Sequence, residues 1–537
     1  MPSIIYINSI KLYTDMKMNL NRYLSAAALM VSLLAAGCAK DNLSQVSLAP
    51  TSETRYNIYP KAVGNNTSGS TRGWVGDVMP YYINGQFELF YLHDAPDQVK
   101  QSSSGQHAIH KFSSKDLLNF SDDGEAIPYG NQNTQDHLIG TGSMLKVGDT
   151  YYFYYTGFNS NASWLTNNNP GFVGGNTREA IMYATSKDLK TWTKKSDYTL
   201  RAAPGYSGTD FRDPYVFYNE EFGQYWMLVS TQQNGKGIIL VYTATNPAAN
   251  NWTIRGPLNV EGDYLMLECS DILKMGGKYY MLFAEDWSST PGTHYRVANS
   301  TAGPWLKPAD GHDMFDGHQF YAGRATTDGS KYYAFGWAHR RNPELDNGTR
   351  TYAGNMISHE IFALPGSNLG VRSPAAVSGY FSKESGPVVN GNVGTVAHTG
   401  TSYTLDGRTA LASYQFAATD STARISGSFS LSNLTGTASI GLNTRADQTS
   451  TYVIKMEPAN QRIAAYNNGQ EVTRVPFTFE AGKIYSFSLV MDASVAVLYV
   501  NDQVALTNRV YSMTAKPWSL SADQLNLTLS NLKIQTH

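Results

Sequence analysis

The chain has 537 residues, of which 42% are hydrophobic and 16% are charged, and its formal net charge is −2. This length suits one large domain or two to three ordinary ones, and the near-neutral charge excludes the basic field of a nucleic-acid-binding protein. Aromatic residues make up 12% of the chain and 47 residues are Gly, which favours short strands joined by tight turns. The composition excludes intrinsic disorder, coiled coils and collagen, and two cysteines do not support a disulfide framework.

Residues 1–38 are predicted to be a signal peptide. Lys17 and Arg22 flank an apolar run over 23–36, which is short for a membrane span. The run ends in LAAGC (34–38), which resembles the bacterial lipoprotein box, so we expect cleavage before Cys38 and lipidation of Cys38. The alternative is an ordinary signal peptide that contains a Cys. We therefore expect a protein of the bacterial cell envelope, lipid-anchored to the outer membrane on its periplasmic face or at the cell surface.

Residues 39–72 are rich in Ser, Thr and Asn and are predicted to form a flexible tether. After them, a Gly turn followed by an aromatic-rich strand recurs five times: GQFELFYLHD (85–94), GDTYYFYYTG (148–157), GQYWMLVST (223–231), GKYYMLFAED (277–286) and GSKYYAFGWAH (329–339). Such a repeat, with no helical periodicity between the copies, predicts an all-β protein with a five-bladed β-propeller over 73–365. A large irregular sandwich is the alternative.

Each aromatic strand is expected to be the second strand of its blade, so the strand before it lies nearest the channel. Counting back about ten residues from each copy identifies five comparable positions: Asp77, Thr141, Asp213, Glu268 and Tyr321. Three of them are carboxylates that are far apart in the sequence. The repeat predicts that they meet around one end of the channel.

The pattern changes near residue 365, where ALPGSNLGVRSP (363–374) is rich in Pro and Gly. We predict a linker over 366–389. Beyond it, short alternating strands such as TYVIKMEP (451–458) and VAVLYVND (495–502) predict a β-sandwich over 390–537.

Three carboxylates at one end of a channel suit the hydrolysis of a glycosidic bond. In retaining enzymes one carboxylate attacks the anomeric carbon, and a second carboxyl group protonates the leaving oxygen and then activates water. Glu268 lies in the apolar run LMLEC (265–269), where a carboxylate is costly unless it is paired or functional. A third carboxylate can hold sugar hydroxyls and stabilise the positive charge of the transition state.

No motif for a nucleotide or a metal occurs in the sequence, so we expect no cofactor and no metal. A polar cluster is interpreted as a loop between blades four and five, rather than a metal site; its members are Asp310, His312, Asp313, Asp316 and His318. The expected partner is an oligo- or polysaccharide, with no nucleic acid and with the membrane contacted only through the lipid anchor.

Three blocks resemble the signature motifs of glycoside hydrolase family 32, the invertases, levanases and inulinases: WVGD (74–77), FRDP (211–214) and EC (268–269). TGS (141–143), YYTG (154–157), FYA (320–322), GW (336–337) and VNDQVALTNRVY (500–511) agree with this family as well. The resemblance spans roughly 70–537 and implies a five-bladed propeller with a sandwich, and hydrolysis with retention at a fructose unit. It implies that Asp77 is the nucleophile, Glu268 the acid/base and Asp213 the transition-state stabiliser. It also implies four substrate-binding residues: Trp74, Ser143, Arg212 and Trp337.

Two departures from the family pattern affect the sugar site. Gly76 replaces an Asn that contacts substrate, and Leu92 replaces a Gln. We therefore expect weak activity on sucrose, a gap at Gly76 that admits a bulkier unit, and a gain in sucrose cleavage when both polar groups are restored.

Two other functions stay open. An arabinan- or xylan-cleaving hydrolase of the same broad propeller group is one of them. A non-catalytic glycan-binding lipoprotein is the alternative from another class, with aromatic platforms formed by Trp74, Trp164, Trp287 and Trp337.

Overall fold

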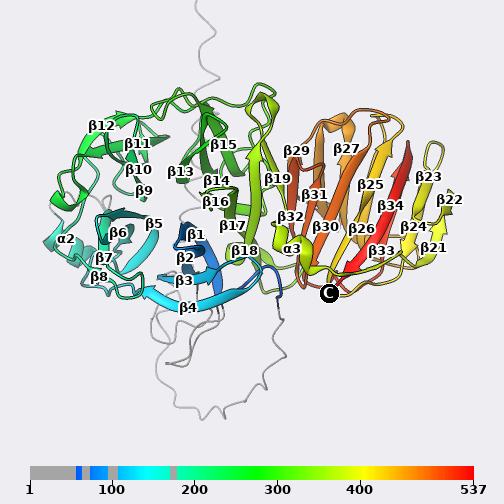
Figure 1. Ribbon diagram of the computed structural model, residues 1–537, viewed down its shortest axis with the longest axis horizontal. Helices are drawn as coiled ribbons and strands as arrows, with labels where there is room; N and C mark the ends of the chain where they lie inside the picture. Colours follow the sequence, from blue (N-terminus) through cyan, green and yellow to red (C-terminus); the bar gives the residue numbers. More distant parts are fainter. Residues whose placement is uncertain (1–55, 63–72, 95–106, 170–177) are drawn as a thin grey trace, which may run out of the picture. The chain divides into compact units, whose positions relative to one another are not determined.

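The computed structural model describes residues 56–62, 73–94, 107–169 and 178–537. The predicted signal segment 1–38, Cys38 and most of the predicted tether lie outside the described residues. The described part is built almost entirely of β-strands, as the composition predicts (Figure 1). Its helices are short: α2 (Ala162–Asn168), α3 (Ala375–Tyr380), η1 (Pro247–Ala249), η2 (Pro365–Ser367) and η3 (Pro458–Asn460).

The first nineteen strands form consecutive antiparallel meanders, drawn in blue to green in Figure 1. The first meander contains β1 (Trp74–Ile83), β2 (Gln86–Asp94), β3 (Ala108–Ser114) and β4 (Phe120–Ile127). The second contains β5 (Leu138–Val147), β6 (Thr150–Phe158), β7 (Glu179–Ser186) and β8 (Thr193–Lys194). The third contains β9 (Phe211–Asn219), β10 (Gln224–Gln233), β11 (Lys236–Ala244) and β12 (Thr253–Pro257).

The fourth meander has three strands, and the fifth returns to the first. The fourth contains β13 (Glu268–Met275), β14 (Lys278–Glu285) and β15 (Gly292–Ala298). The fifth contains β16 (Phe320–Thr327), β17 (Tyr332–Asn342), β18 (Thr349–Ala363) and β19 (Leu369–Arg372). β18 pairs with β1 through Val75 and Gly354, so the last meander and the first share one sheet.

The first strand of every meander carries a register irregularity near its start. The strand pairing is interrupted between Val75 and Val78, between Gly140 and Gly142, between Glu268 and Asp271, and between Tyr321 and Arg324, and β9 shows the same break opposite Leu228 and Ser230. The backbone of Asp213, Cys269 and Ala322 has a positive φ of 57°, 54° and 53°. A β-bulge redirects side chains at a strand end, and such bulges are frequent next to active sites. The five positions predicted from the repeat lie at or beside these irregularities.

The second group of strands, yellow to red in Figure 1, forms two antiparallel sheets. One sheet has the order β22-β23-β34-β25-β30-β31-β32, with β20 on β34: β20 (Lys383–Ser385), β22 (Thr395–Thr399), β23 (Ser402–Asp406), β25 (Thr422–Leu431), β30 (Tyr485–Asp492), β31 (Val495–Val500), β32 (Val504–Arg509) and β34 (Asn526–Thr536). The other has the order β21-β24-β33-β26-β27-β28-β29: β21 (Val389–Val393), β24 (Ala412–Phe416), β26 (Thr437–Thr444), β27 (Ser450–Glu457), β28 (Arg462–Asn467), β29 (Gln470–Pro476) and β33 (Trp518–Asp523). Alternate side chains of both sheets form one buried core, in which Phe416 stacks on Trp518 at 4.3 Å between ring centroids.

Hydrogen bonds of buried polar side chains link the meanders to the two sheets that follow them. The buried Asp316 carboxylate accepts hydrogen bonds from the backbone N–H of Thr507 at 2.7 Å and from His359 at 3.0 Å. Arg509 donates to the carbonyls of Ala338 and His339. Part of the polar cluster interpreted as a loop therefore serves this junction, and no metal-binding group of three or more His, Cys, Asp or Glu occurs among the described residues.

Two segments differ from the sequence-based expectation. Residues 56–62, placed in the tether, are docked, because the buried Asp492 accepts the backbone N–H groups of Asn57, Ile58 and Tyr59. Residues 366–389, placed in a linker, contain β19 and β20, which pair with β18 and β34. Local composition does not reveal the contacts of 57–59 with Asp492 or of β20 with β34, because those partners are distant in sequence. No helix of the described residues is long and apolar enough to cross a membrane.

Candidate active site

A cavity of about 550 Å³ lies where the first strands of the meanders begin. All five positions predicted from the repeat line it: Asp77, Thr141, Asp213, Glu268 and Tyr321. Two further carboxylates join them, Glu179 and Asp286. The repeat therefore predicted the position of the cavity, although not its full charge.

Asp77 is held by two hydrogen bonds from other meanders. Its Oδ1 accepts from the indole N–H of Trp337 at 3.0 Å, and its Oδ2 accepts from the hydroxyl of Thr141. Because both carboxylate oxygens are engaged by donors, the side chain is fixed in one orientation.

Asp213 lies beside Asp77 in the buried floor of the cavity. Its side chain accepts the backbone N–H of Cys269 at 2.9 Å, and its own N–H donates to the hydroxyl of Thr156. Burial raises the pKa of Asp213; the positive charge of Arg212 opposes this rise and the negative charge of Asp77 adds to it. Cys269 is a buried free cysteine, and its Sγ lies 3.8 Å from the Thr141 hydroxyl oxygen.

Glu268 is suited to carry a proton near neutral pH. Its Oε1 accepts from Arg212 at 3.0 Å and its Oε2 from the Tyr321 hydroxyl at 2.7 Å. Burial raises the pKa of Glu268 to about 7; Arg212 opposes this rise, and the charges of Asp213 and Asp77 add to it.

Arg212 is shared between Glu268 and Glu179. It contacts Glu179 at 3.3 Å and Asp210 at 2.8 Å, and these carboxylates raise its own pKa despite its burial. Burial also raises the pKa of Glu179 to about 7, while Arg212 and the N–H of Phe211 lower it. Glu179 could not be predicted from the sequence, because nothing in the β7 segment distinguishes a cavity carboxylate from a strand-end residue.

Arg324 joins three first strands below the cavity. Its buried guanidinium donates to the carbonyls of Cys269 at 3.0 Å, of Asp213 at 3.5 Å, and of Gly142. The irregular backbone at these strand starts leaves carbonyls that need donors, and one planar group with five N–H donors satisfies several of them.

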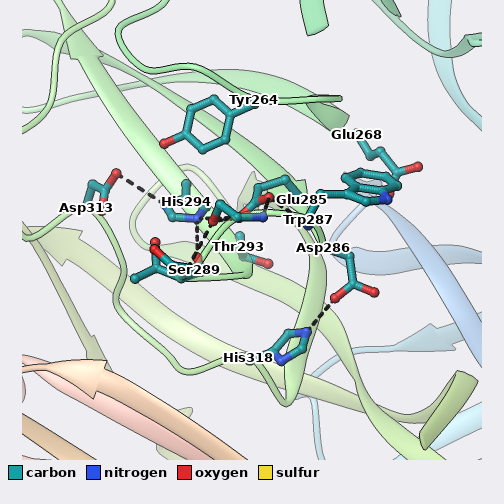
Figure 2. A network of polar contacts seen from close by, with 12 residues as sticks. Tyr264, Glu268, Glu285, Asp286, Trp287, Ser289, Thr293, His294, Asp313 and His318 are labelled. Atoms are coloured by element: carbon teal, nitrogen blue, oxygen red, sulfur yellow. Dashed lines mark hydrogen bonds and ion pairs between the residues drawn. The ribbon is translucent and has the colours of Figure 1, made fainter. Parts of the chain in front are cut away.

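A second polar network supports the cavity wall beyond Glu268 (Figure 2). The buried Glu285 accepts the N–H groups of Trp287 at 3.0 Å and of Ser288 at 2.9 Å. The buried His294 lies 3.4 Å from Glu285 and 3.2 Å from Asp313. This network fixes the loop after β14, which places Asp286 and Trp287 on the cavity lining.

Comparison with known families identifies the chain. Residues 70–364, more than half of its length, match the model described as "Glycosyl hydrolases family 32 N-terminal domain". The chain belongs to glycoside hydrolase family 32. Residues 367–534 match the model "GH32, BT1760-like, C-terminal domain". The resemblance seen in the signature motifs is confirmed.

Individual relatives of this family 32 protein are distant. A sucrose-6-phosphate hydrolase of Streptococcus mutans is 26% identical over 326 residues, which cover 58% of this chain and 61% of the relative. A raffinose invertase of Escherichia coli is 22% identical over 310 residues, which cover 55% of this chain and 61% of the relative. The chain therefore matches less than two thirds of the length of these curated relatives.

Solved structures share the fold. The sucrose-6-phosphate hydrolase from Lactobacillus gasseri has a TM-score of 0.66 at 16% identity, with 90% of this chain and 93% of that chain covered. The exo-inulinase from Aspergillus awamori has a TM-score of 0.63 at 18% identity, with 90% and 98% covered. The likeness therefore extends through both groups of strands.

Of the four substrate-binding residues that the family 32 resemblance implies, the cavity contains Arg212 and Trp337. Trp74 and Ser143 do not line it. The indole of Trp74 donates to Glu344 at 3.0 Å and lies under the guanidinium of Arg340, whereas the buried Ser143 hydroxyl accepts the N–H of Val216 at 2.8 Å. Trp74 therefore contacts Glu344 and Arg340, and Ser143 links β5 to β9, while the role of these two residues in sugar binding stays a prediction.

The expectation of a gap at Gly76 is wrong, because the side chain of Tyr352 on β18 occupies that space. A Cβ atom built on Gly76 would lie 2.2 Å from the Tyr352 hydroxyl oxygen and 2.7 Å from Cζ. The ring of Tyr352 also lines the cavity and stands edge-on to Trp337 at 5.1 Å. Gly76 therefore leaves room for a bulky aromatic side chain from another strand. Leu92 lines the cavity as expected.

Gly76→Asn is therefore expected to impair the protein rather than restore a sugar contact. Overpacking at a filled site costs roughly 1–3 kcal/mol, and here it displaces the strand that carries Asp77. Thermal unfolding and kcat/KM on the true substrate measure the effect, with Gly386→Asn as the control because no atom lies within 4 Å of its Cβ position. Adding Tyr352→Ala should relieve the clash. Unchanged stability and activity in Gly76→Asn alone would contradict the packing argument.

Proposed function

We propose that this protein is a retaining glycosidase that hydrolyses O-glycosyl bonds of fructose units in fructans or related furanoside-containing glycans. The observation that carries the proposal is the meeting of Asp77, Asp213 and Glu268 in one cavity, with the pKa of Glu268 raised to about 7. Family membership supports the fructoside specificity. The five meanders support a five-bladed propeller as the catalytic domain, with the boundaries 73–365 for the propeller and 390–537 for the sandwich.

In the proposed reaction Asp77 attacks the anomeric carbon of the fructosyl unit while Glu268 gives its proton to the leaving oxygen. Glu268, now ionised, takes a proton from water as that water displaces Asp77 from the anomeric carbon. Two displacements retain the anomeric configuration. Asp213, held by the Cys269 N–H, binds sugar hydroxyls and stabilises the positive charge that develops on the ring.

A substrate panel tests this proposal. The protein is incubated with levan, inulin, sucrose, arabinan and xylan, and the products are analysed by chromatography and by NMR of the anomeric configuration. Release of fructose or fructo-oligosaccharides with retention is expected. Cleavage of arabinan or xylan instead would reassign the substrate, and binding without turnover would favour a glycan-binding protein.

We also propose that Cys38 is lipidated and anchors the protein to the outer membrane. The lipoprotein box at 34–38 supports this location. Cys38→Ala should shift the protein from the membrane fraction to the soluble fraction, because the variant lacks the residue that carries the lipid. Immunoblotting of fractionated cells measures this shift. Continued membrane association of the variant would refute the anchor.

A further inference from the structure

We infer that His294 is a positioning residue that works as an imidazolium, whose two N–H groups hold the loop over 286–291 in place. This loop joins β14 to β15 and contributes Asp286 and Trp287 to the lining of the catalytic cavity, whereas His294 itself does not line it. The inference rests on the proposed function only for its effect on activity, because the charge of the ring and the order of the loop are measured without substrate.

Both ring nitrogens of His294 face oxygen atoms that accept hydrogen bonds. Nδ1 lies 3.2 Å from the Asp313 carboxylate. Nε2 lies 2.9 Å from the Thr290 carbonyl oxygen and 3.4 Å from the Glu285 carboxylate. A neutral imidazole has one N–H and one lone pair, so on one side a lone pair would face an oxygen. The contacts are therefore satisfied together only when both nitrogens carry a proton.

The immediate neighbours of the ring favour a positive charge on it. Glu285 and His294 are almost completely buried, and their contact is the only ion pair of Glu285 within the part of the chain that the structure describes. The rings of Phe283 and Tyr264 each lie 5.6 Å from the His294 ring, and aromatic faces attract cations. Burial alone would lower the pKa of His294, but hydrogen bonds to Asp313 and Glu285 outweigh it, and the pKa is raised.

The other charged groups around the ring belong to Asp313. Arg296 opposes the charge of His294, but its guanidinium pairs with Asp313 at 2.6 Å. Lys307 lies 3.4 Å from the same carboxylate. Asp313 thus keeps two cationic partners when His294 is neutral, whereas Glu285 would be left as a buried carboxylate without one. Leaving a buried charge unpaired is costly, so the pair of His294 and Glu285 is the sensitive contact.

Glu285 and His294 together fasten both halves of the loop (Figure 2). Glu285 accepts the N–H groups of Trp287 and Ser288 and the Ser288 hydroxyl. His294 donates to the Thr290 carbonyl. Loss of one proton from the ring removes a donor and unpairs Glu285, so both attachments weaken. The hold on the loop is complete below the ordinary histidine pKa of about 6.5, and it is lost as the pH rises through the raised pKa of His294.

The charge of the ring is measured first. 15N NMR of protein labelled at histidine distinguishes a ring with two N–H groups from a neutral one. The signal of His294 is the one that disappears in His294→Gln, or in His294→Asn if the first variant does not fold. It should titrate above the ordinary value of about 6.5. A ring that is neutral at that pH would overturn the inference.

The order of the loop is measured by hydrogen exchange of the Trp287 and Ser288 N–H groups. In His294→Gln this exchange should be roughly tenfold faster or more, because the buried Glu285 loses its charged partner. His312→Gln is the matched control, since His312 also lies near a carboxylate, at 3.7 Å, but its side chain is 25% exposed and stands outside the network. Equal exchange in His294→Gln and the wild type would overturn the inference.

The same exchange is followed in the wild type as a function of pH. After correction for the intrinsic pH dependence of exchange, protection of Trp287 and Ser288 should fall as His294 loses its proton. This measurement needs no variant that folds. Protection that stays constant across the titration of His294 would overturn the inference.

The effect on activity is measured on the oligosaccharide that the panel identifies. His294→Gln should raise KM by roughly threefold or more with kcat little changed, because the loop forms part of the cavity wall while Asp77 and Glu268 are untouched. A fall in kcat at unchanged KM would contradict the positioning role. If the wild-type protein hydrolyses no panel sugar, the proposed function fails, and the NMR and exchange measurements still decide whether a charged His294 holds the loop.

Discussion

Asp77→Asn is expected to lower kcat by roughly 10⁴-fold or more, because an amide cannot form the covalent intermediate that splits the reaction into two displacements. The amide keeps the shape of the carboxylate: its oxygen can accept from the Trp337 indole, and its NH2 group can donate to the Thr141 hydroxyl oxygen. It also removes a negative charge that raises the pKa of Asp213 and Glu268. The variant should therefore be at least as stable to heat as the wild type.

Steady-state kinetics on the panel substrate and a thermal unfolding curve measure both effects. Near wild-type turnover in Asp77→Asn would remove Asp77 from the nucleophile role. A loss of activity together with a large fall in the unfolding temperature would point to a structural role instead. An aryl fructoside does not rescue this variant, because a better leaving group does not replace the nucleophile.

Glu268→Gln is expected to lower kcat on oligosaccharides by about 10²- to 10⁴-fold, the usual contribution of a general acid. An aryl fructoside, whose leaving group needs no proton, should retain its first step in this variant, seen as a burst of released phenol. Loss of both substrates to the same extent would contradict the acid role. This contrast separates Glu268 from Asp77, which both substrates require.

The pH profile gives an independent check. Glu268 acts as an acid only while protonated, and its pKa is raised to about 7, so kcat/KM of the wild type should fall as the pH rises through about 7. In Glu268→Gln this alkaline limb should vanish from the residual activity. A limb that persists unchanged would assign the titration to another group.

Glu179→Gln tests whether the neighbouring Glu179 carboxylate influences the pH at which kcat/KM falls. Glu179 shares Arg212 with Glu268, and its pKa is also raised to about 7. Without the Glu179 carboxylate, Arg212 pairs more fully with Glu268 and one negative charge disappears, which favours ionised Glu268. The alkaline limb should therefore move to lower pH while turnover below it persists. A shift to higher pH would contradict this coupling.

The repeat of aromatic strands predicted the most consequential feature of the site from the sequence alone. Strand positions are periodic and each copy begins at a Gly turn, so a fixed offset selects equivalent places in every meander. Asp77, Asp213 and Glu268 lie in one cavity because that offset coincides with the register irregularities at the strand starts. The all-β class and the family followed from equally local signals, namely composition and short motifs.

Only the tertiary structure decided which other groups complete the cavity. Glu179, Asp286 and Tyr352 enter it from a neighbouring strand, a loop and the last meander, and no local pattern records these long-range contacts. The resemblance implied that Trp74 and Ser143 bind sugar, which stays a prediction; a bulge changes which face a strand side chain reaches, and in this structure the two contact Glu344 and Val216. Gly76 shows the same limit: the missing side chain is visible in the sequence, whereas the tyrosine that fills its place lies 276 residues away on β18.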